Sequence, residues 1–496
     1  MNYQIHTDRV LFSRDPMIYG QFLEHFHRQI YGGVYEPDSP LSDEQGFRTD
    51  VLDALRQIRV PVIRWPGGCF VSSYHWEKGV GETRVPSFDK AWRVEDPNTF
   101  GTDEFIQLCR KIGCQPYICT NAGTGTEEEM SNWMEYCNLV DEGEYARRRI
   151  ANGHREPYGV KYWSIGNENY GGWEIGAKSA PEWSRYVLES SKMMQHVDPT
   201  CSLSAAALDD LDWNIALLKA AGDRLEWISI HAYWDPLWQE NKPADYETCM
   251  GRTSALGTSI RKVRGLLNAM GLEHRIKIAF DEWNLRGWHH PHAHTIAQGI
   301  TKDDYLLPRD ENDINSTYTM ADAVFSACFL NELLRNADIV GMANFAPIVN
   351  TRGAIFTHPE GIVKRTTYHV FDLYVNHMHD QVLAQFAYNP DRYSTPGDVQ
   401  VDTIDLVATR DSDTGALAIS AINKHATEPR QIEIALDAPF NQCTMHTLDG
   451  DSPDDYNDIG RDSVQIRLNT DGAKLDGNTL HLTLPPHSVN VIECAK

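Results

Sequence analysis

The sequence predicts an α/β protein, a (β/α)8 TIM barrel followed by a C-terminal β-sandwich, and three observations support this prediction. The chain has 496 residues, which exceeds the roughly 250 residues typical of a barrel alone and leaves room for a second domain. Short apolar runs rich in β-branched residues alternate with segments of helical periodicity. From about Gln385 onward, the helical patterns give way to alternating apolar and polar residues, which is typical of a sandwich.

The predicted barrel strands are eight apolar runs, each of which ends in polar or glycine residues. Amphipathic segments separate them. In the segment 181–197, Trp183, Val187 and Met194 recur at helical spacing behind a proline suited to a first helical turn. A strand followed by a helix, repeated around the chain, favours a closed parallel barrel. The eight runs are 19–25, 61–67, 115–123, 161–168, 202–207, 225–233, 275–283 and 339–346.

The C-terminal region predicts a second, all-β domain. Apolar and polar residues alternate in four segments, 405–409, 416–422, 431–436 and 480–484, and this period is that of a half-buried strand. The opening segment 3–12 alternates in the same way, so we expect it to add a strand to the C-terminal sheet. The predicted domains are therefore a catalytic barrel over 14–384 and a β-sandwich that combines 385–496 with the N-terminal strand 1–13.

Composition excludes several classes of function. A formal net charge of −25 argues against nucleic acid or a membrane surface as a partner, because both are negatively charged. The N-terminus lacks the pattern of a signal peptide, and no stretch approaches the roughly 20 apolar residues of a membrane span. We therefore expect a soluble, cytoplasmic protein. The ten cysteines are scattered without a C-x-x-C pair, so reduced and mostly buried thiols are expected.

The polar residues that follow the predicted strands are the candidates for chemistry, because catalytic groups in such barrels lie where strands end. Strand four ends at Glu168 and strand seven at Glu282. Glycoside hydrolysis needs two carboxyl groups, one of raised pKa that protonates the leaving oxygen and one that attacks or activates water. A single glutamate at a strand end is more often a solvated loop residue. A pair on opposed strands of one barrel favours a catalytic site.

The neighbours of these glutamates fit a sugar pocket. Asn167 can donate to a sugar hydroxyl, while the faces of Trp163, Trp173 and Trp283 suit sugar stacking and would raise the pKa of a carboxyl group.

Three other strand ends carry polar side chains. Glu24 ends strand one, and Arg64 in strand two could keep a neighbouring carboxylate ionised. His231 and Tyr233 end strand six and could bond to a nucleophilic carboxylate. Each of these residues has an alternative interpretation as a core ion pair or a packed aromatic.

Several motifs, in order along the chain, closely resemble the signatures of the family 51 α-L-arabinofuranosidases. They are GQFLEH at 20–25, IYGG at 30–33, FGTDEF at 100–105, GTGT at 123–126, TYHVF at 367–371, and three that contain candidate site residues, RWPGG at 64–68, GNE at 166–168 and DEWN at 281–284.

The resemblance implies a barrel with a jelly-roll-like β-domain, no cofactor and a homo-oligomer. It also implies retaining hydrolysis of terminal arabinofuranose from arabinan or arabinoxylan oligosaccharides, with Glu168 as general acid/base and Glu282 as nucleophile. Glu24, Cys69, Asn167 and Tyr233 would line the arabinose subsite, and Trp92 would lie on the leaving-group side. Cys69 stands where family members have cysteine or asparagine.

One position departs from the family. Many members carry a glutamine that contacts the sugar after the eighth strand, whereas glycine stands at the matching place within 349–354. Asn350 or Arg352 is expected to take over that contact.

A histidine cluster follows the nucleophile strand, at His289, His290, His292 and His294. Imidazoles this close together could chelate zinc or nickel. The helical H-E-x-x-H spacing is absent, however, and Pro291 disfavours a regular helix. We therefore expect no metal site, and a loop at the mouth of the active site that shapes leaving-group recognition.

Three alternatives remain at this point. A retaining β-xylosidase or an endoglucanase would use the same scaffold and the same pair of glutamates. A metal-dependent hydrolase would use the histidine cluster instead. A non-catalytic carbohydrate-binding protein would keep the pocket, but it would have no need for both glutamates.

Overall fold

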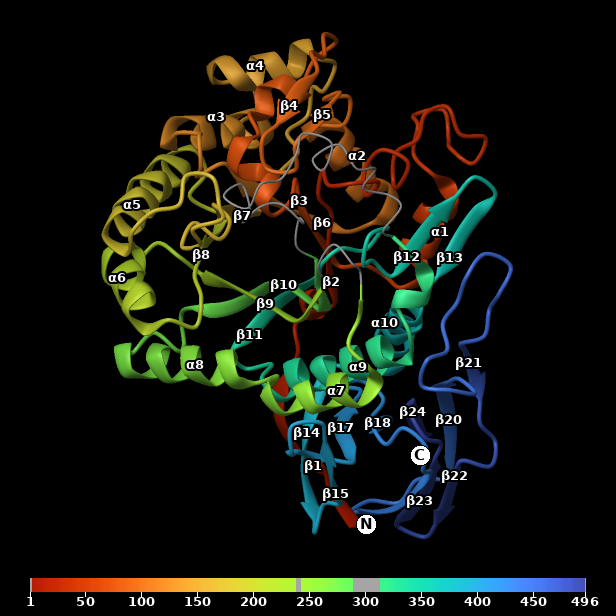
Figure 1. The fold of residues 1–496 in the computed structure, drawn as a ribbon. Coiled ribbons are helices and arrows are strands. Elements are labelled where there is room, and N and C mark those ends of the chain that lie inside the picture. The colour runs from red at the N-terminus through yellow and green to blue at the C-terminus, as the bar shows by residue number, and fades with distance from the viewer. Residues whose placement is uncertain (1, 238–241, 289–312, 496) are drawn as a thin grey trace.

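A computed structural model describes residues 2–237, 242–288 and 313–495. These residues form a closed eight-stranded barrel, helices outside it and a ten-stranded sheet at one end (Figure 1). The predicted barrel with a C-terminal sheet domain is thereby confirmed.

The barrel strands are parallel throughout, and β11 closes the ring by pairing with both β10 and β2. Each of the eight predicted runs coincides with one of them, although β9 and β10 continue four and five residues past the ends predicted for their runs. In chain order they are β2 (Gly20–Phe22), β3 (Val62–Trp65), β6 (Gln115–Thr120), β7 (Tyr162–Ile165), β8 (Ser202–Ala206), β9 (Trp227–Leu237), β10 (Lys277–Trp288) and β11 (Val340–Phe345).

The helices follow the expected amphipathic segments. Helix α5 (Ala180–Val197) begins with a capping box between Ser179 and Glu182, carries a proline in its first turn, and buries Trp183, Val187 and Met194. The others are α1 (Thr49–Gln57), α2 (Thr102–Ile112), α3 (Glu127–Asn138), α4 (Gly143–Ala151), α6 (Leu211–Ala221), α7 (Tyr246–Arg252), α8 (Thr258–Met270), α9 (Met320–Arg335) and α10 (Thr366–His377).

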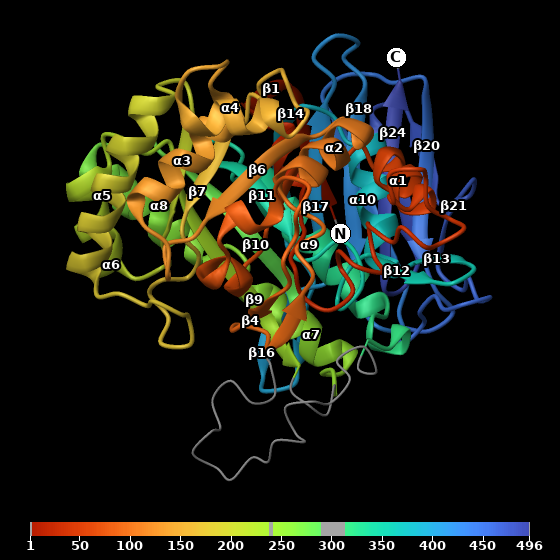
Figure 2. The same ribbon diagram turned by 90° about the horizontal axis from the view of Figure 1, so that it is seen from above.

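Helix α9 is buried on nearly all sides. It packs against β10 of the barrel and also against strands of the C-terminal sheet, so both of its faces are covered. Figure 2 shows the same sheet beside α10. The two last helices therefore form the layer between the barrel and the sheet.

The sheet has the order β21-β20-β24-β18-β17-β14-β1-β19-β23-β22. It curls over its own apolar core, so that β18 approaches β23 and β20 approaches β22. The strands are β1 (Asn2–Ser13), β14 (Gln381–Tyr388), β17 (Ile404–Arg410), β18 (Leu417–Asn423), β19 (Arg430–Leu436), β20 (Gln442–Asp449), β21 (Gln465–Leu468), β22 (Ala473–Asp476), β23 (Thr479–Leu484) and β24 (Ser488–Ala495).

The N-terminal strand β1 lies between β14 and β19, antiparallel to the first and parallel to the second. Strand β14 begins at Gln381, slightly before the predicted domain boundary at 385. Smaller hairpins are β4 (Ser87–Asp89) with β5 (Val94–Asp96), β12 (Ile355–His358) with β13 (Gly361–Lys364), and β15 (Arg392–Thr395) with β16 (Val399–Asp402).

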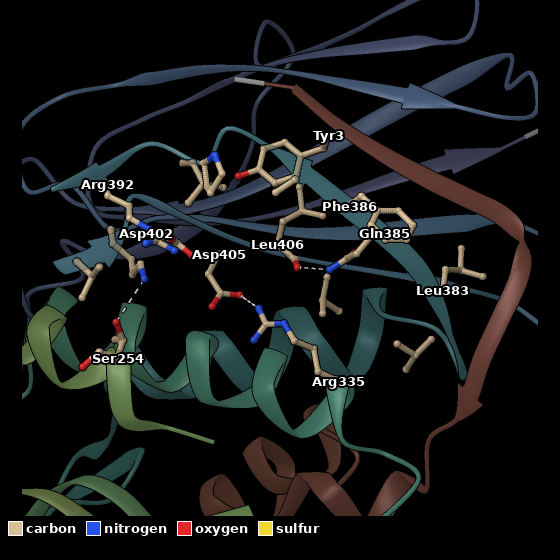
Figure 3. A pocket seen from close by; sticks show the side chains of 18 of the residues that line it. Tyr3, Ser254, Arg335, Leu383, Gln385, Phe386, Arg392, Asp402, Asp405 and Leu406 are labelled. Atoms are coloured by element: carbon tan, nitrogen blue, oxygen red, sulfur yellow. Dashed lines mark hydrogen bonds and ion pairs between the residues drawn. The ribbon is translucent and has the colours of Figure 1, made fainter. Parts of the chain in front are cut away.

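A polar cavity of about 650 Å³ lies between the end of α9 and the strands β14 to β17 (Figure 3). Arg335 of α9 forms an ion pair with Asp405 of β17 beside it. None of the predicted site residues lines this cavity. The predicted site residues lie instead at the strand ends of the barrel.

All ten cysteines are free thiols, and eight of them are buried, as predicted. In the three described ranges, no helix combines the length and the apolar composition needed to cross a bilayer.

Candidate active site

Arg64 joins three strand ends at the mouth of the barrel. Its side chain is completely buried, and Nη1 donates to Glu282 Oε1 over 2.6 Å. Nη2 donates to Asn167 Oδ1 over 2.9 Å, and Nε lies 3.4 Å from Asp281 Oδ2. One guanidinium from β3 therefore holds Asn167, two residues beyond β7, and two carboxylates of β10 in place.

Glu168 lies just beyond β7 with φ at 45°, a left-handed conformation that costs a non-glycine residue about 1–3 kcal/mol and is common at functional sites. Its Oε1 accepts from His231 Nδ1 over 2.8 Å, and its Oε2 accepts from Trp173 Nε1 over 2.8 Å. A carboxylate oxygen of Glu168, one of Glu282 and a nitrogen of His231 all lie within 4.8 Å of one another. The two predicted catalytic carboxylates therefore face each other.

His231 carries the proton in this arrangement. Burial lowers the pKa of His231, but the charge of Glu282 and the hydrogen bonds to Asp281 and Glu168 raise it to about 10. Burial raises the pKa of Glu168, but the hydrogen bond and the charge of His231 outweigh it and hold that pKa below its usual value. A raised pKa was expected for the catalytic acid Glu168, but it is found for His231 instead. Glu168 and His231 therefore share one proton.

Glu24, two residues beyond the end of β2, is held by the loop that follows β3. Its Oε1 accepts from the backbone N–H groups of Gly68 and Phe70 and from Trp92 Nε1, each over 3.1 Å. Burial and then the charge of Glu282 raise the pKa of Glu24 to about 8. Glu24 is therefore protonated at neutral pH and keeps a hydroxyl with which it can donate.

The glycines of this loop allow the side chains of Glu24 and Glu282 to lie close to the loop backbone. A Cβ added at Gly67 would lie 2.3 Å from Glu24 Cγ, and one at Gly68 would lie 3.0 Å from Glu282 Oε1. The φ of 149° at Gly67 also suits glycine alone.

Tyr233 donates its hydroxyl to Glu282 Oε2 over 2.8 Å. The guanidinium of Arg352 lies over the Tyr233 ring, 4.9 Å from its centroid. Asn350 is not part of this group, because its amide donates to the carbonyl of Arg28 and to Thr357 Oγ1, over 2.7 and 2.8 Å. Of the two residues expected to replace the glutamine, Arg352 reaches the site and Asn350 is used to shape its own loop.

Comparison with known proteins gives matches along most of the chain. The model of the α-L-arabinofuranosidase 1 domain matches residues 54–251, and that of the α-L-arabinofuranosidase C-terminal domain matches 281–488. α-L-Arabinofuranosidase C of Emericella nidulans is 34% identical over 486 residues, covering 93% of this chain and 92% of that protein.

Two further relatives agree. The intracellular exo-α-(1→5)-L-arabinofuranosidase of Halalkalibacterium halodurans is 31% identical over 509 residues, covering 97% of this chain and 96% of that one. The solved GH51 α-L-arabinofuranosidase of Thermotoga petrophila RKU-1 shares 34% identity with a TM-score of 0.85, over 99% of both chains. The chain belongs to the family 51 α-L-arabinofuranosidases. Its motifs had indicated this family, and membership makes the protein a glycoside hydrolase.

The active site of this arabinofuranosidase family member also contains a buried glutamate that no sequence pattern had indicated. Glu174 is 5% exposed and accepts from Asn167 Nδ2 over 3.2 Å. Burial raises the pKa of Glu174 to about 7, and atoms of Cys69, Glu168 and Glu174 lie within 4.8 Å of one another. The residue follows two glycines in a loop, where neither periodicity nor a strand end signals a buried carboxyl group.

Asp281, the first residue of the DEWN motif and the neighbour of Glu282, is a further buried carboxylate of the site for which the sequence predicted no role. It accepts from Tyr117 Oη over 2.8 Å and from Ser229 Oγ over 2.6 Å, and it is completely buried. The negative charge of Asp281 helps to raise the pKa of Arg64 and that of His231.

The tryptophans correct the predicted sugar platform. Trp163 and Trp283 are fully buried, because their side chains pack into the core, Trp283 against Phe329, Phe345 and Phe371. The prediction that they stack on sugar is wrong. Trp173 is 51% exposed beside Glu168 and keeps an accessible face. His289, His290, His292 and His294 lie outside the described residues.

Proposed function

We propose that this chain is a retaining, exo-acting α-L-arabinofuranosidase that releases terminal arabinofuranose from oligosaccharides of arabinan or arabinoxylan. The main support is the approach of the Glu168 and Glu282 carboxylate oxygens to within 4.8 Å. Inverting glycosidases separate the two carboxyl groups by about 6.5–9.5 Å to admit a water, whereas retaining enzymes place them about 5–5.5 Å apart. The short separation favours a covalent intermediate.

In the first step, a Glu282 oxygen bonds to the anomeric carbon while the bond from that carbon to the leaving oxygen breaks. Arg64 and Tyr233 donate to different oxygens of Glu282 and so fix the orientation of its carboxyl group. The leaving oxygen takes its proton from Glu168, which draws on the proton shared with His231. In the second step Glu168 accepts a proton from water, and the resulting hydroxide oxygen displaces Glu282 with retained configuration.

We also assign the arabinose subsite to Glu24, Cys69, Asn167 and Tyr233, with Arg352 in place of Asn350. Trp173, exposed beside Glu168, fits the leaving-group side. Trp92 donates a hydrogen bond to Glu24. We therefore place it at the border between the arabinose subsite and the leaving-group side.

Further expectations concern the whole protein. The name of the Halalkalibacterium halodurans relative supports an exo mode of action, α-1,5 linkages and a cytoplasmic location. We propose a homo-oligomer, testable by light scattering, and a division into a barrel over 14–384 and a sandwich of 385–496 with 1–13. No metal or cofactor enters the proposed reaction, so exhaustive chelation should leave turnover unchanged.

A panel of nitrophenyl glycosides tests the substrate class. The α-L-arabinofuranoside should be hydrolysed fastest, and α-1,2, α-1,3 and α-1,5 linked arabino-oligosaccharides should then give the linkage preference. NMR of the first product should show the retained anomer. Faster hydrolysis of a β-xyloside or an internal glucan bond would favour the xylosidase or endoglucanase instead, and an inverted product would contradict the covalent mechanism.

A further inference from the structure

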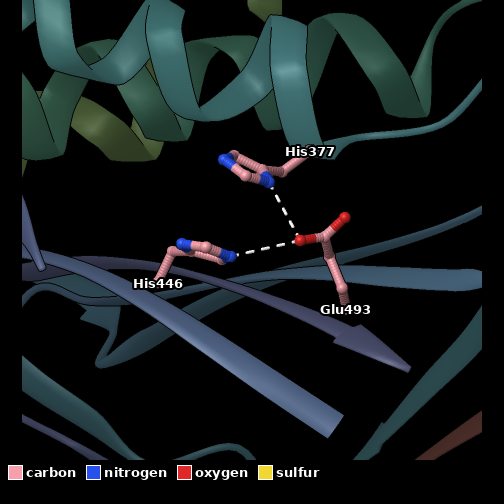
Figure 4. Close-up of side chains that lie close together, drawn as sticks. All are labelled: His377, His446 and Glu493. Carbon is pink, nitrogen blue, oxygen red and sulfur yellow. Dashed lines mark hydrogen bonds and ion pairs between the residues drawn. The ribbon is translucent and has the colours of Figure 1, made fainter. Parts of the chain in front are cut away.

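Three metal-ligating side chains converge far from the barrel mouth, at the contact between α10 and the C-terminal sheet (Figure 4). His377 is the last residue of α10, His446 lies on β20 and Glu493 on β24. His377 Nδ1 lies 2.9 Å and His446 Nε2 lies 3.1 Å from the same oxygen, Glu493 Oε2. The two imidazole rings stack with centroids 4.1 Å apart.

We propose that His377, His446 and Glu493 bind a divalent transition-metal ion, with zinc as the favoured ion, and that this ion joins the last barrel helix to the C-terminal sheet. Imidazole nitrogen and carboxylate oxygen are ordinary zinc ligands, and two histidines with one carboxylate form a known ligand set.

The geometry is close to that of an occupied site. One donor atom from each of the three side chains lies within 4.8 Å of the others. Donors in a tetrahedral zinc site, at bonds of about 2.0–2.2 Å, lie about 3.3 Å apart. The nitrogen-to-oxygen distances of 2.9 and 3.1 Å need only a small outward movement of the side chains to admit an ion at their centre.

The electrostatics also favour a cation. The negative end of the α10 helix dipole lies at His377. The carboxyl group of Glu493, in contact with both imidazole rings, supplies a negative charge at the same place. The side chains of His377, His446 and Glu493 are 25%, 20% and 35% exposed. Solvent can therefore deliver the ion and supply a water as the fourth ligand.

The position of the cluster indicates a structural ion. Helix α10 follows the eighth barrel strand and packs against β24 and β20 of the sheet. Helices in such a barrel run back from the mouth, so the end of α10 lies on the side opposite the active site. An ion there would tie two layers of the fold together without touching substrate.

Zinc titration of the untagged, full-length protein tests the proposal. After chelation and dialysis, calorimetry with ZnCl2 and elemental analysis should give one bound ion per chain and a raised Tm. His446→Asn and Glu493→Gln should each weaken zinc binding by at least about tenfold. His481→Asn is the matched control, because His481 is a half-exposed histidine of the same sheet, 3.5 Å from Glu433, and it should bind zinc like the parent protein.

Two further measurements separate this site from others. Replacing His289, His290, His292 and His294 together by asparagine should leave zinc binding unchanged, and one equivalent of zinc should leave turnover unchanged. The proposal fails if no zinc binds, if binding is lost with those four histidines, or if zinc inhibits and binding is lost in Glu282→Gln. His446→Asn without zinc should retain the parent's turnover and Tm, which separates the loss of a ligand from unfolding.

Discussion

At the scale of single residues, the site is organised by the pairing of charges. Arg64 and the protonated His231 are the cations that face the carboxylates of Glu168, Asp281 and Glu282. Glu24 is bonded to neutral N–H groups instead, so nothing of comparable strength offsets its burial, and it holds a proton. These three glutamates of the site therefore differ: Glu282 is held by Arg64, Glu168 shares a proton with His231, and Glu24 is a neutral hydrogen-bond donor.

The proposed roles of the two catalytic glutamates predict different behaviour in their alanine variants. Glu282→Ala should lose turnover on every substrate, because no glycosyl-enzyme can form. Glu168→Ala should lose roughly 10²–10⁴-fold on natural oligosaccharides. It should still react once with a nitrophenyl arabinofuranoside, because nitrophenolate leaves without protonation. The glycosyl-enzyme then accumulates, which mass spectrometry of the protein measures.

Azide distinguishes the two roles further. It attacks without a general base, so it should restore turnover to Glu168→Ala and give an arabinosyl azide of retained configuration. Rescue of Glu282→Ala with an inverted azide, and no effect on Glu168→Ala, would show that the roles are reversed.

The parent protein should lose activity and stability at alkaline pH as Glu24 ionises, and Glu24→Gln should not show this loss. Burial and the charge of Glu282 raise the pKa of Glu24 to about 8, so the stability that its protonated form contributes is complete below its ordinary pKa of 4.5 and is lost as the pH rises through 8. The glutamine keeps a neutral donor at every pH. Relative to the parent, its Tm should fall less between pH 6 and 9, and the alkaline fall in kcat/KM should move to higher pH. Identical profiles in both proteins would contradict this assignment.

At the scale of elements, the strands were predictable and the loops were not. Each barrel strand overlaps a predicted run, because β-branched apolar residues bounded by polar ones suit a strand buried on both faces, and only β9 and β10 extend past the predicted ends. Glu174 and Arg352 lie in loops whose course depends on contacts with distant residues. Asn350 has φ at 54° and bonds to Arg28 and Thr357, and no local pattern reveals such bonds. The same applies to Trp283, whose direction depends on the helix packed against it.

A buried ion-pair cluster joins β9, β10 and α9. Replacing one of its members, Asp322, should cause a large loss of stability. Arg286 is 1% exposed and donates to Asp322 Oδ1 and Oδ2 over 2.9 and 3.0 Å, and it also pairs with Asp235. Asp322→Ala would leave the arginine half paired and remove the cap at Thr319, so unfolding should become about 3–5 kcal/mol easier in urea. Asp53→Ala, which breaks an exposed pair with Arg56, should change it by less than about 0.5 kcal/mol. Equal effects would contradict the assignment.

At the scale of the whole molecule, the chain begins and ends in the same sheet, with the barrel between. β1 enters the middle of the sheet, and helices α9 and α10 cover the contact with the barrel. The alternation of residues 3–12 was enough to predict a strand that joins the C-terminal sheet. The order of the ten strands was not predictable, because it depends on which edges meet after the intervening barrel has formed.

The position of β1 predicts that a single residue near the N-terminus stabilises the C-terminal sheet. Ile5 is completely buried in the core shared with Leu383, Ile434 and Leu482, so Ile5→Ala should cost about 2–5 kcal/mol through lost contacts and a cavity. Leu11, in the same strand, is 44% exposed, and Leu11→Ala should cost less than about 0.5 kcal/mol. Urea unfolding measures both. Because neither residue is near the active site, kcat should match that of the parent wherever the variants are folded. Equal stability of the two variants would show that the first strand contributes little to the fold.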